Sequence, residues 1–322
     1  MKVLIPNVGR RGYLVRYLKS ISNLEVQVYV SDCDATASGL YGNNDGYFIL
    51  PKPVDNPRKY VDTLIDLCKR VGISVVIPVI DPEIAILAEY KKEFESNNIF
   101  VSVSSKRVLD ICYSKQRMNE FLKTQGFLVP RTYDNIPDFK LAIKDKIISF
   151  PVIIKPIYGS GSVATYKVST MEEVESLFTE GSVIQQFLQG DEYGIDVFND
   201  TNCKPVRCVV KKKISMRSGE TDKSLTIYDK ELQNLMIDLA EKLGHVCNLD
   251  SDIIRKGDDL YIIDLNPRFG GGYPATHEAG VNLLELVLKL AKGEQIEPQF
   301  GNYTENLLVM KEVAVVTHKL SK

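Results

Sequence analysis

The sequence has few of the residues that build zinc or disulfide centres. Its 322 residues include six cysteines without a C-x-x-C pair, no tryptophan and three histidines that lie far apart, at His245, His277 and His318. Zinc sites need closely spaced Cys and His ligands, so a zinc site is not expected. The scattered cysteines instead predict reduced, structural thiols in a cytoplasmic protein.

Long apolar runs and an excess of one charge are also missing. The longest apolar stretches, such as 73–80, are far shorter than the roughly 20 residues of a transmembrane helix. The amino terminus lacks the residue order of a signal peptide. Forty Lys and Arg face 42 Asp and Glu, so no basic surface for a nucleic-acid backbone is expected. We therefore expect neither a membrane nor a nucleic acid as a partner.

The first third of the chain alternates short apolar strands with amphipathic helices. The predicted elements are strands near 2–8, 25–32, 47–51, 73–79 and 99–104, with helices over 10–20, 57–71 and 82–96. Apolar strands that alternate with helices are typical of a parallel sheet covered on both faces. The sequence therefore predicts an α/β, doubly wound domain over 1–110.

After a predicted helix at 114–126 the pattern changes to α+β. The next expected elements are short strands near 152–156, 163–168 and 182–187 around a helix at 170–178. Longer antiparallel strands follow from 191, and then a helix at 229–243, a hairpin over 247–266, a helix at 281–292 and a final strand near 311–317.

The first motif is a glycine-containing turn, 7–12, between the first strand and the first helix. Backbone N–H groups at a helix start can bind an anion, and Asp32 closes the next strand, where a dinucleotide-binding fold has its ribose carboxylate. The spacing is G-x-x-G and not G-x-G-x-x-G, so a tight turn with Asp32 at the surface is favoured over NAD binding. Arg10 and Arg11 could still hold a substrate carboxylate or phosphate.

The second motif is an apolar strand that ends in Lys155 and leads into the glycine-serine loop 158–162. A flexible loop with exposed N–H groups can wrap a polyphosphate while a lysine supplies positive charge. The loop lacks the G-K-[ST] of a Walker A motif. A hairpin with a surface lysine is an equally good interpretation of these residues alone.

Acidic residues inside an apolar hairpin give the strongest indication of function. If 256–258 forms a three-residue loop, Asp250 pairs with Asp264, and Asn266 shares that face because side chains alternate along a strand. Two facing carboxylates repel each other, and together with an amide oxygen they suit Mg²⁺ beside nucleotide phosphates. The alternative, an Asp that caps a buried strand, leaves Asp250, Asn266 and Arg268 unexplained.

Two weaker patterns lie between these motifs. The strand end 185–188, followed by a glycine and acidic residues in 190–193, could bind an adenine edge and a ribose, although an ordinary strand and turn explains it better when taken alone. The run 211–213 with Arg217 is typical of a solvated face. Alternation along a strand nevertheless puts Lys211 and Lys213 on one face, where they could meet a transferred phosphate.

In this order the motifs resemble the ATP-grasp superfamily, and within it the branch similar to the carbamoyl-phosphate synthetase large chain. The resemblance covers nearly the whole chain. It implies a pre-ATP-grasp domain over 1–110, a nucleotide-clamping lid over 111–188 and a catalytic subdomain over 189–322. It further implies an enzyme that uses ATP and one or two Mg²⁺ ions to activate a small carboxylate as an acyl phosphate and join it to an amine or related nucleophile. A homodimer through the N-terminal domain is the family-based expectation.

The resemblance also assigns roles to individual residues. Those implied for ATP binding are Lys115, Lys155, Gly159, Ser160, Gly161, Gln186, Phe187, Leu188 and Glu192. Those implied for metal binding are Asp250, Asp264 and Asn266, and those implied for catalysis near the transferred phosphate are Lys213, Arg217 and Arg268. We expect substrate contacts from Gly9, Arg10, Arg11, Asp81, Gly271, Gly272 and Tyr273.

Two positions depart from the family pattern, which usually has Glu where Gln186 and Asp264 stand. The shorter side chain of Asp264 leaves the number of metal ions open. Nothing in the chain resembles the second ATP-grasp half or the glutaminase partner of the full synthetase, so carbamoyl phosphate synthesis by this chain alone is not expected. Two rival functions remain: a nicotinamide-dependent dehydrogenase that uses the N-terminal fold, and a non-catalytic ATP-binding protein.

Overall fold

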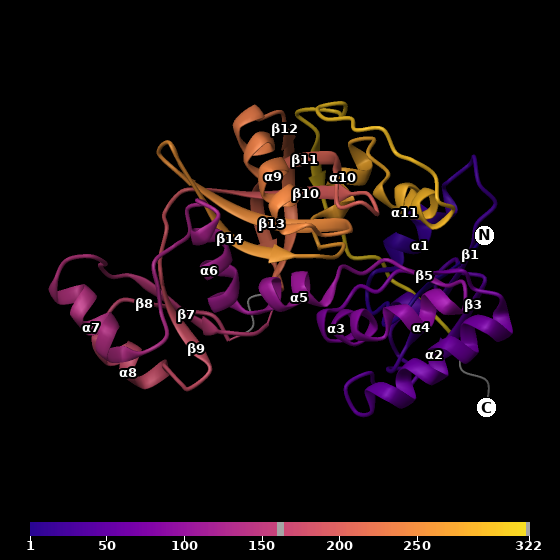
Figure 1. The fold of residues 1–322 in the computed structure, drawn as a ribbon, viewed down its shortest axis with the longest axis horizontal. Coiled ribbons are helices and arrows are strands. Elements are labelled where there is room, and N and C mark those ends of the chain that lie inside the picture. The colour runs from indigo at the N-terminus through magenta and orange to yellow at the C-terminus, as the bar shows by residue number, and fades with distance from the viewer. Residues whose placement is uncertain (160–163, 320–322) are drawn as a thin grey trace.

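The computed structural model describes residues 1–159 and 164–319. Its chain forms a parallel sheet and two antiparallel sheets, and the larger antiparallel sheet lies between the other two (Figure 1). Among the described residues no helix is both long enough and apolar enough to cross a membrane. All six cysteines are free thiols.

The N-terminal domain is a five-stranded parallel sheet in the order β3-β2-β1-β4-β5. Its elements are β1 (Lys2–Ile5), α1 (Gly12–Lys19), β2 (Gln27–Asp32), the 3₁₀ turn η1 (Ser38–Tyr41), β3 (Gly46–Ile49), α2 (Pro57–Val71), β4 (Val75–Val76), α3 (Asp81–Glu89), α4 (Lys91–Ser96) and β5 (Phe100–Val101). Val3 and Ile5 pack on the α1 side, whereas Leu4 packs on the α2 and α3 side. Because apolar side chains point to both faces, helices must cover both. The predicted doubly wound domain is confirmed.

Two helices predicted in this domain can be compared with the observed bounds. Helix α2 has the predicted bounds because Asn56 accepts a hydrogen bond from the backbone N–H of Lys59, Pro57 occupies the first turn and Gly72 ends the helix in the left-handed conformation. The single helix predicted over 82–96 is instead two, α3 and α4, which meet at Tyr90.

The smaller antiparallel sheet has the order β6-β9-β7-β8 and carries α7 and α8; we call it the lid sheet. Helices α5 (Lys106–Tyr113) and α6 (Lys115–Thr124) precede it, and its own elements are β6 (Thr132–Tyr133), α7 (Ile136–Lys144), β7 (Val152–Pro156), β8 (Tyr166–Val168), α8 (Met171–Leu177) and β9 (Ser182–Gln186). Phe139, Val152 and Ile184 form its own small core. Helix α6 packs elsewhere, since Met118 and Leu122 belong to the core of the large sheet.

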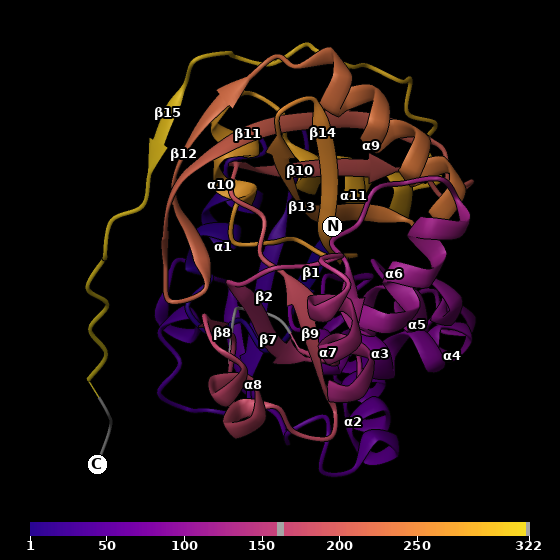
Figure 2. The same ribbon diagram turned by 90° about the vertical axis from the view of Figure 1, so that its left-hand side faces the viewer.

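The large antiparallel sheet has the order β14-β13-β10-β11-β12-β15. Its elements are β10 (Asp191–Asn199), β11 (Pro205–Arg217), β12 (Glu220–Ile227), α9 (Lys230–Leu243), β13 (Cys247–Lys256), β14 (Asp259–Asn266), α10 (Tyr273–Glu278), α11 (Leu283–Ala291) and β15 (Leu308–Met310). The final strand predicted near 311–317 is wrong, because the last strand is β15 and the chain beyond it runs without strand structure to residue 319 (Figure 2). The domain boundaries near 111 and 189 stay predictions.

One shared core joins the N-terminal domain to the large sheet. Val15 of α1, Leu284 of α11 and Phe269 after β14 belong to the same buried cluster as the β1 side chains. Burial of this apolar surface fixes the carboxyl end of the parallel sheet against the end of β14. The loops after β1 and β4 therefore lie where the large sheet presents its polar residues.

Candidate active site

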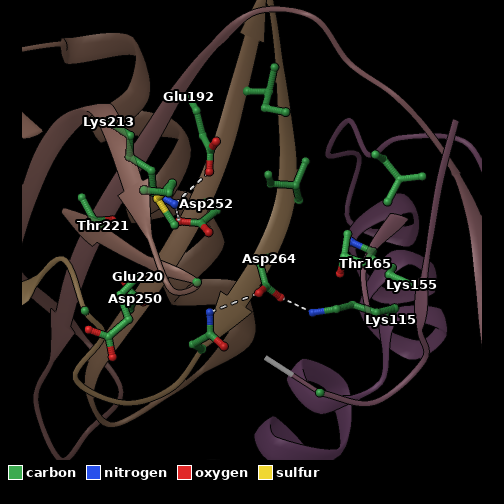
Figure 3. A pocket seen from close by; sticks show the side chains of 18 of the residues that line it. Lys115, Lys155, Thr165, Glu192, Lys213, Glu220, Thr221, Asp250, Asp252 and Asp264 are labelled. Carbon is green, nitrogen blue, oxygen red and sulfur yellow. Dashed lines mark hydrogen bonds and ion pairs between the residues drawn. The ribbon is translucent and has the colours of Figure 1, made fainter. Parts of the chain in front are cut away.

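A cavity of about 400 Å³ lies between the lid sheet and the large sheet. The lid contributes Lys155 and Gln185, and the large sheet contributes Asp252 and Asp264. One side chain of the N-terminal domain, Arg11, also reaches this cavity. Figure 3 shows carboxylates of the large sheet facing lysines that come from the other side.

The β13–β14 hairpin places its carboxylates differently from the sequence prediction. The predicted pairing of Asp250 with Asp264 is wrong, because Asp264 lies opposite Asp252 and Asp250 lies opposite Asn266. Lys256 pairs with Asp259, so the loop has two residues rather than three, and Ile263 is an extra residue in β14. This bulge puts Ile263 and Asp264 both on the cavity face, while Ile262 and Leu265 stay in the core.

Lys115 and Lys155 bring positive charge to Asp264. The backbone N–H of Lys115 donates to the carbonyl of Ile157 (3.0 Å), which ties the start of α6 to the end of β7. The Lys115 ammonium forms an ion pair with the Asp264 carboxylate. Burial opposes ionisation of Asp264, but these two lysines outweigh it and hold its pKa below the ordinary value. Burial and the charge of Lys115 lower the pKa of Lys155 to about 8, so an anion bound beside Lys155 would stabilise its charged form.

A second ion-pair group lies on the large sheet. Lys213 on β11 contacts Glu192 on β10 (2.8 Å) and Asp252 on β13 (2.6 Å). Burial disfavours the Lys213 cation, but Asp252 and Glu192 outweigh that effect and raise its pKa. Burial, followed by the nearby Glu192 and Asp264, raises the pKa of Asp252 although Lys213 opposes the shift. In this group one lysine faces two carboxylates.

Arg268 connects the large sheet to the N-terminal domain. Its Nε donates to Asp81 Oδ1 at the start of α3 (2.6 Å), and its Nη2 donates to Asn266 Oδ1 (3.3 Å). Its Nη1 lies 4.0 Å from Asp250 Oδ2. Arg268 therefore lies at the junction of the two domains with its guanidinium at the wall of the cavity.

Most of the predicted site residues do meet in this cavity. Those that line it are Arg11, Lys115, Lys155, Gly159, Gln186, Phe187, Leu188, Glu192, Lys213, Asp250, Asp264, Asn266, Arg268, Gly271 and Gly272. Ser160 and Gly161 lie outside the described residues. Phe187 and Leu188 add an aromatic and an apolar side chain to the lining beside Gln186. The Lys167 ammonium, which does not line the cavity, lies 3.8 Å from the centre of the Phe187 ring.

Other predicted residues lie outside the cavity lining. Arg217 is largely exposed and pairs with Asp222 (3.3 Å), and Arg10 is exposed. Tyr273 is fully buried, and its hydroxyl accepts a hydrogen bond from the backbone N–H of Leu284 (3.3 Å). Asp81 and Gly9 do not line the cavity either. Asp81 accepts a hydrogen bond from Arg268, and Gly9 donates its backbone N–H to Asp32 in the turn after β1.

The structure gives Asp32 a role in that turn. Its Oδ2 accepts from the backbone N–H of Gly9 (2.8 Å) and its Oδ1 from that of Asp34 (3.0 Å). Asp32 is thus buried rather than at the surface, but the favoured interpretation, a tight turn, accounts for its carboxylate without a ribose.

Two acidic residues of the cavity, Asp252 and Glu220, are not among the residues predicted from the sequence. The indication for Asp252 was present, because residues two apart on a strand share a face and Asp252 follows Asp250 on β13. Nothing local marks Glu220, which begins β12 and meets Arg11 of the N-terminal domain only through tertiary structure.

Comparison with known proteins identifies this architecture. The profile of the "PylC-like, N-terminal domain" matches residues 3–102, and that of the "ATP-grasp domain" matches residues 112–272, half of the chain. The chain belongs to the ATP-grasp family. The predicted family is therefore confirmed.

Individual relatives of this ATP-grasp chain are distant in sequence. It is 22% identical to the carbamoyl phosphate synthase large chain of Thermoanaerobacter sp. over 228 residues, and 24% identical to the arginine-specific large chain of Geobacillus stearothermophilus over 201 residues. The first match covers 62% of this chain and 20% of the Thermoanaerobacter protein. The second covers 56% of this chain and 19% of the Geobacillus protein. The chain thus spans about a fifth of the length of the curated relatives it matches.

Solved structures show the same fold. The biotin carboxylase domain of Hydrogenobacter thermophilus 2-oxoglutarate carboxylase, described with Mg-ADP, ADP and bicarbonate, matches with a TM-score of 0.74 over 95% of this chain and 73% of that one, at 18% identity. The N5-carboxyaminoimidazole ribonucleotide synthetase of Thermotoga maritima matches with a TM-score of 0.69 over 92% and 77%, at 15% identity. The predicted ATP-grasp fold is confirmed.

Proposed function

We propose that this protein is an ATP- and Mg²⁺-dependent ligase that activates a small carboxylate as an acyl phosphate and transfers it to an amine or related nucleophile. The observation that carries the proposal is the cavity in which Lys115, Lys155 and Lys213 converge on opposed carboxylates between two sheets. Polyphosphate needs cations from several directions, and a nucleotide base needs an apolar slot such as that beside Phe187.

The residues present fit a bound magnesium ion. Asp252 and Asp264 oppose each other, and the Asn266 amide lies two residues beyond Asp264 on the same strand. Among the described residues no three Asp, Glu, His or Cys side chains could enclose an ion by themselves, but Mg²⁺ commonly uses one or two carboxylates and completes its shell with phosphate oxygens and water. We therefore propose Asp252, Asp264 and Asn266 as the ligands, with Asp252 in place of Asp250. The ion would neutralise and orient the phosphates.

The chain's own residues supply positioning and charge neutralisation for the transfer. Lys155, Lys213 and Arg268 would neutralise the transferred phosphoryl group as the substrate carboxylate oxygen attacks the γ-phosphorus and the bond to ADP breaks. In the second step an amine nitrogen attacks the acyl carbon, and inorganic phosphate leaves with the electrons of the broken C–O bond. An ammonium substrate loses one proton before this attack and a second as the amide forms. The two sheets exclude water from the intermediate.

Several observations support this function over its rivals. The relatives are named carbamoyl phosphate synthase large chains, and one neighbour of the same fold was solved with Mg-ADP. Asp32 is engaged by the turn after β1, and no comparison favours a dehydrogenase. A cytoplasmic location and a homodimer stay predictions.

The test is ADP release from Mg-ATP in the presence of pooled amino acids and small carboxylates. Asp264→Asn should lower the rate about 100-fold, because the variant loses a metal ligand and leaves Lys115 unpaired. Asp238→Asn on the exposed face of α9 is the matched control, since it removes only a surface ion pair with Lys242. Undiminished activity in Asp264→Asn would contradict the metal assignment. ATP binding without ADP release from any pool would favour the non-catalytic alternative.

A further inference from the structure

The end of the cavity beside the N-terminal domain carries charged groups that the phosphates do not require. Asp250 and Glu220 line this end together with Arg11, and they come from β13, β12 and the turn before α1. Arg11 is the one member contributed by the N-terminal domain. Their chemistry indicates what kind of substrate this end accepts.

Asp250 is an acid built into the cavity wall. Its nearest cation is Arg268 Nη1 at 4.0 Å, and Arg268 directs its shorter contacts to Asp81 and Asn266 instead. Among the described residues the Asp250 carboxylate makes no side-chain hydrogen bond. A methyl group added at Gly270 would lie 1.9 Å from Asp250 Oδ2, so the loop after β14 leaves room for this carboxylate only because residue 270 is glycine. Figure 3 shows Asp250 apart from the Asp264–Lys115 pair.

Arg11 supplies positive charge at the same end, whereas Tyr13 does not line the cavity. Arg11 Nη2 is 3.5 Å from Glu220 Oε1, and Lys311 holds the other oxygen of Glu220 at 3.1 Å. Arg11 Nε and the Tyr13 hydroxyl are buried and have no hydrogen-bond partner among the described residues. Tyr13 lies among charged groups that include Arg11 and Asp250. Unpaired buried donors cost free energy that a bound acceptor would recover.

We propose that this end binds an amino acid as the amine acceptor, with its ammonium group at Asp250 and its carboxylate at Arg11. This inference rests on the proposed ligase function and specifies its second substrate. An ammonium group at Asp250 lies beside Arg268, where the acyl phosphate forms, whereas the carboxylate lies farther away at the N-terminal domain. A carboxylate suits the forked donors of Arg11, and the glycine loop 270–272 keeps the passage between the two groups free of side chains.

The experiment uses the full-length chain saturated with Mg²⁺ and a nonhydrolysable ATP analogue. Calorimetric titration with the standard amino acids, first pooled and then singly, should find a ligand. The same compound without its amine (the hydroxy acid) and without its carboxylate (the decarboxylated amine) should each bind at least about tenfold more weakly, since each loses a charged contact. No binding by any amino acid, or equal binding by the truncated compounds, would overturn the proposal.

Two variants assign the contacts. Asp250→Asn should weaken binding of the amino acid and of the decarboxylated amine about tenfold and leave binding of the hydroxy acid unchanged. Arg11→Gln should weaken binding of the amino acid and of the hydroxy acid and leave binding of the decarboxylated amine unchanged. Asp238→Asn is again the matched control. Unchanged affinities in both variants would refute these assignments. If the ATP analogue itself does not bind, the proposed ligase function fails; if it binds and no amino acid does, only this inference fails.

Discussion

At the scale of single residues, three consecutive lysines have three different roles. Lys211 is almost fully buried, where it pairs with Asp196 and donates to Thr276 (3.0 Å). Lys212 points to the other face and pairs with Asp191 at the surface (2.7 Å). Lys213 reaches the cavity. Alternation along β11 predicted that Lys211 and Lys213 share a face. The sequence alone could not show that Lys211 forms a buried ion pair with Asp196 while Lys213 lines the cavity.

Glu83 provides a residue-scale prediction in the N-terminal domain. It is completely buried, where Asn7 Nδ2 donates to its Oε1 (2.9 Å) and the Tyr60 hydroxyl also donates to that oxygen. Burial raises its pKa from 4.5 to about 7, against the opposing effect of these hydrogen bonds. The folded chain therefore binds more protons than the unfolded chain across this range, and stability should fall as the pH rises through it.

The expected loss is on the order of 3 kcal/mol between the two pKa values. Glu83→Gln keeps an uncharged polar group of the same shape and should flatten this part of the pH dependence. Thermal unfolding at about pH 5 and about pH 8 measures the difference, with Glu95→Gln on the exposed face of α4 as the matched control. The same pH dependence in Glu83→Gln and the unaltered chain would show that Glu83 is not the titrating group.

At the scale of secondary structure, sequence patterns gave the elements better than their registers. The bounds of α2 and β7 match the predictions because caps and apolar runs are local. The β13–β14 pairing failed because the predicted loop had three residues, although Gly257-Asp258 suits a two-residue turn, and because the bulge at Ile263 has no clear local signature. The bulge also explains why Asp252, and not Asp250, lies opposite Asp264. Helix α7, which follows Asn135 as its cap, was overlooked although its cap is local.

The loop after β14 provides an element-scale prediction. Gly270→Ala should displace the Asp250 carboxylate or the loop itself, because the added methyl would overlap Oδ2 at 1.9 Å. We expect ADP release to fall at least about tenfold, while the melting temperature drops by no more than a few degrees, since the added methyl would meet a side chain of the cavity wall and not the backbone. Gly42→Ala is the control, because a methyl group there meets nothing within 4 Å. Unaltered ADP release in Gly270→Ala would show that this wall does not shape the site.

At the scale of the whole molecule, the site depends on three parts of the chain that are distant in sequence. The lid sheet supplies Lys155, the large sheet supplies Asp252 and Asp264, and the N-terminal domain supplies Arg11 and the Asp81 that orients Arg268. The family resemblance predicted this assembly and the composition did not. The predicted site also included Arg10, Arg217 and Tyr273, which do not line the cavity. The position of a residue in a motif does not determine where its side chain points.

In the proposed function, the lid sheet and the large sheet together bind a magnesium nucleotide. Calorimetric titration of a nonhydrolysable ATP analogue, with and without Mg²⁺, tests it most directly in the unaltered chain, in Lys155→Met and in Lys140→Met, which removes only a surface ion pair of the lid. We predict Mg²⁺-dependent binding that Lys155→Met weakens at least about tenfold and Lys140→Met leaves unchanged. Binding that is indifferent to Mg²⁺ and equal in all three proteins would contradict the account.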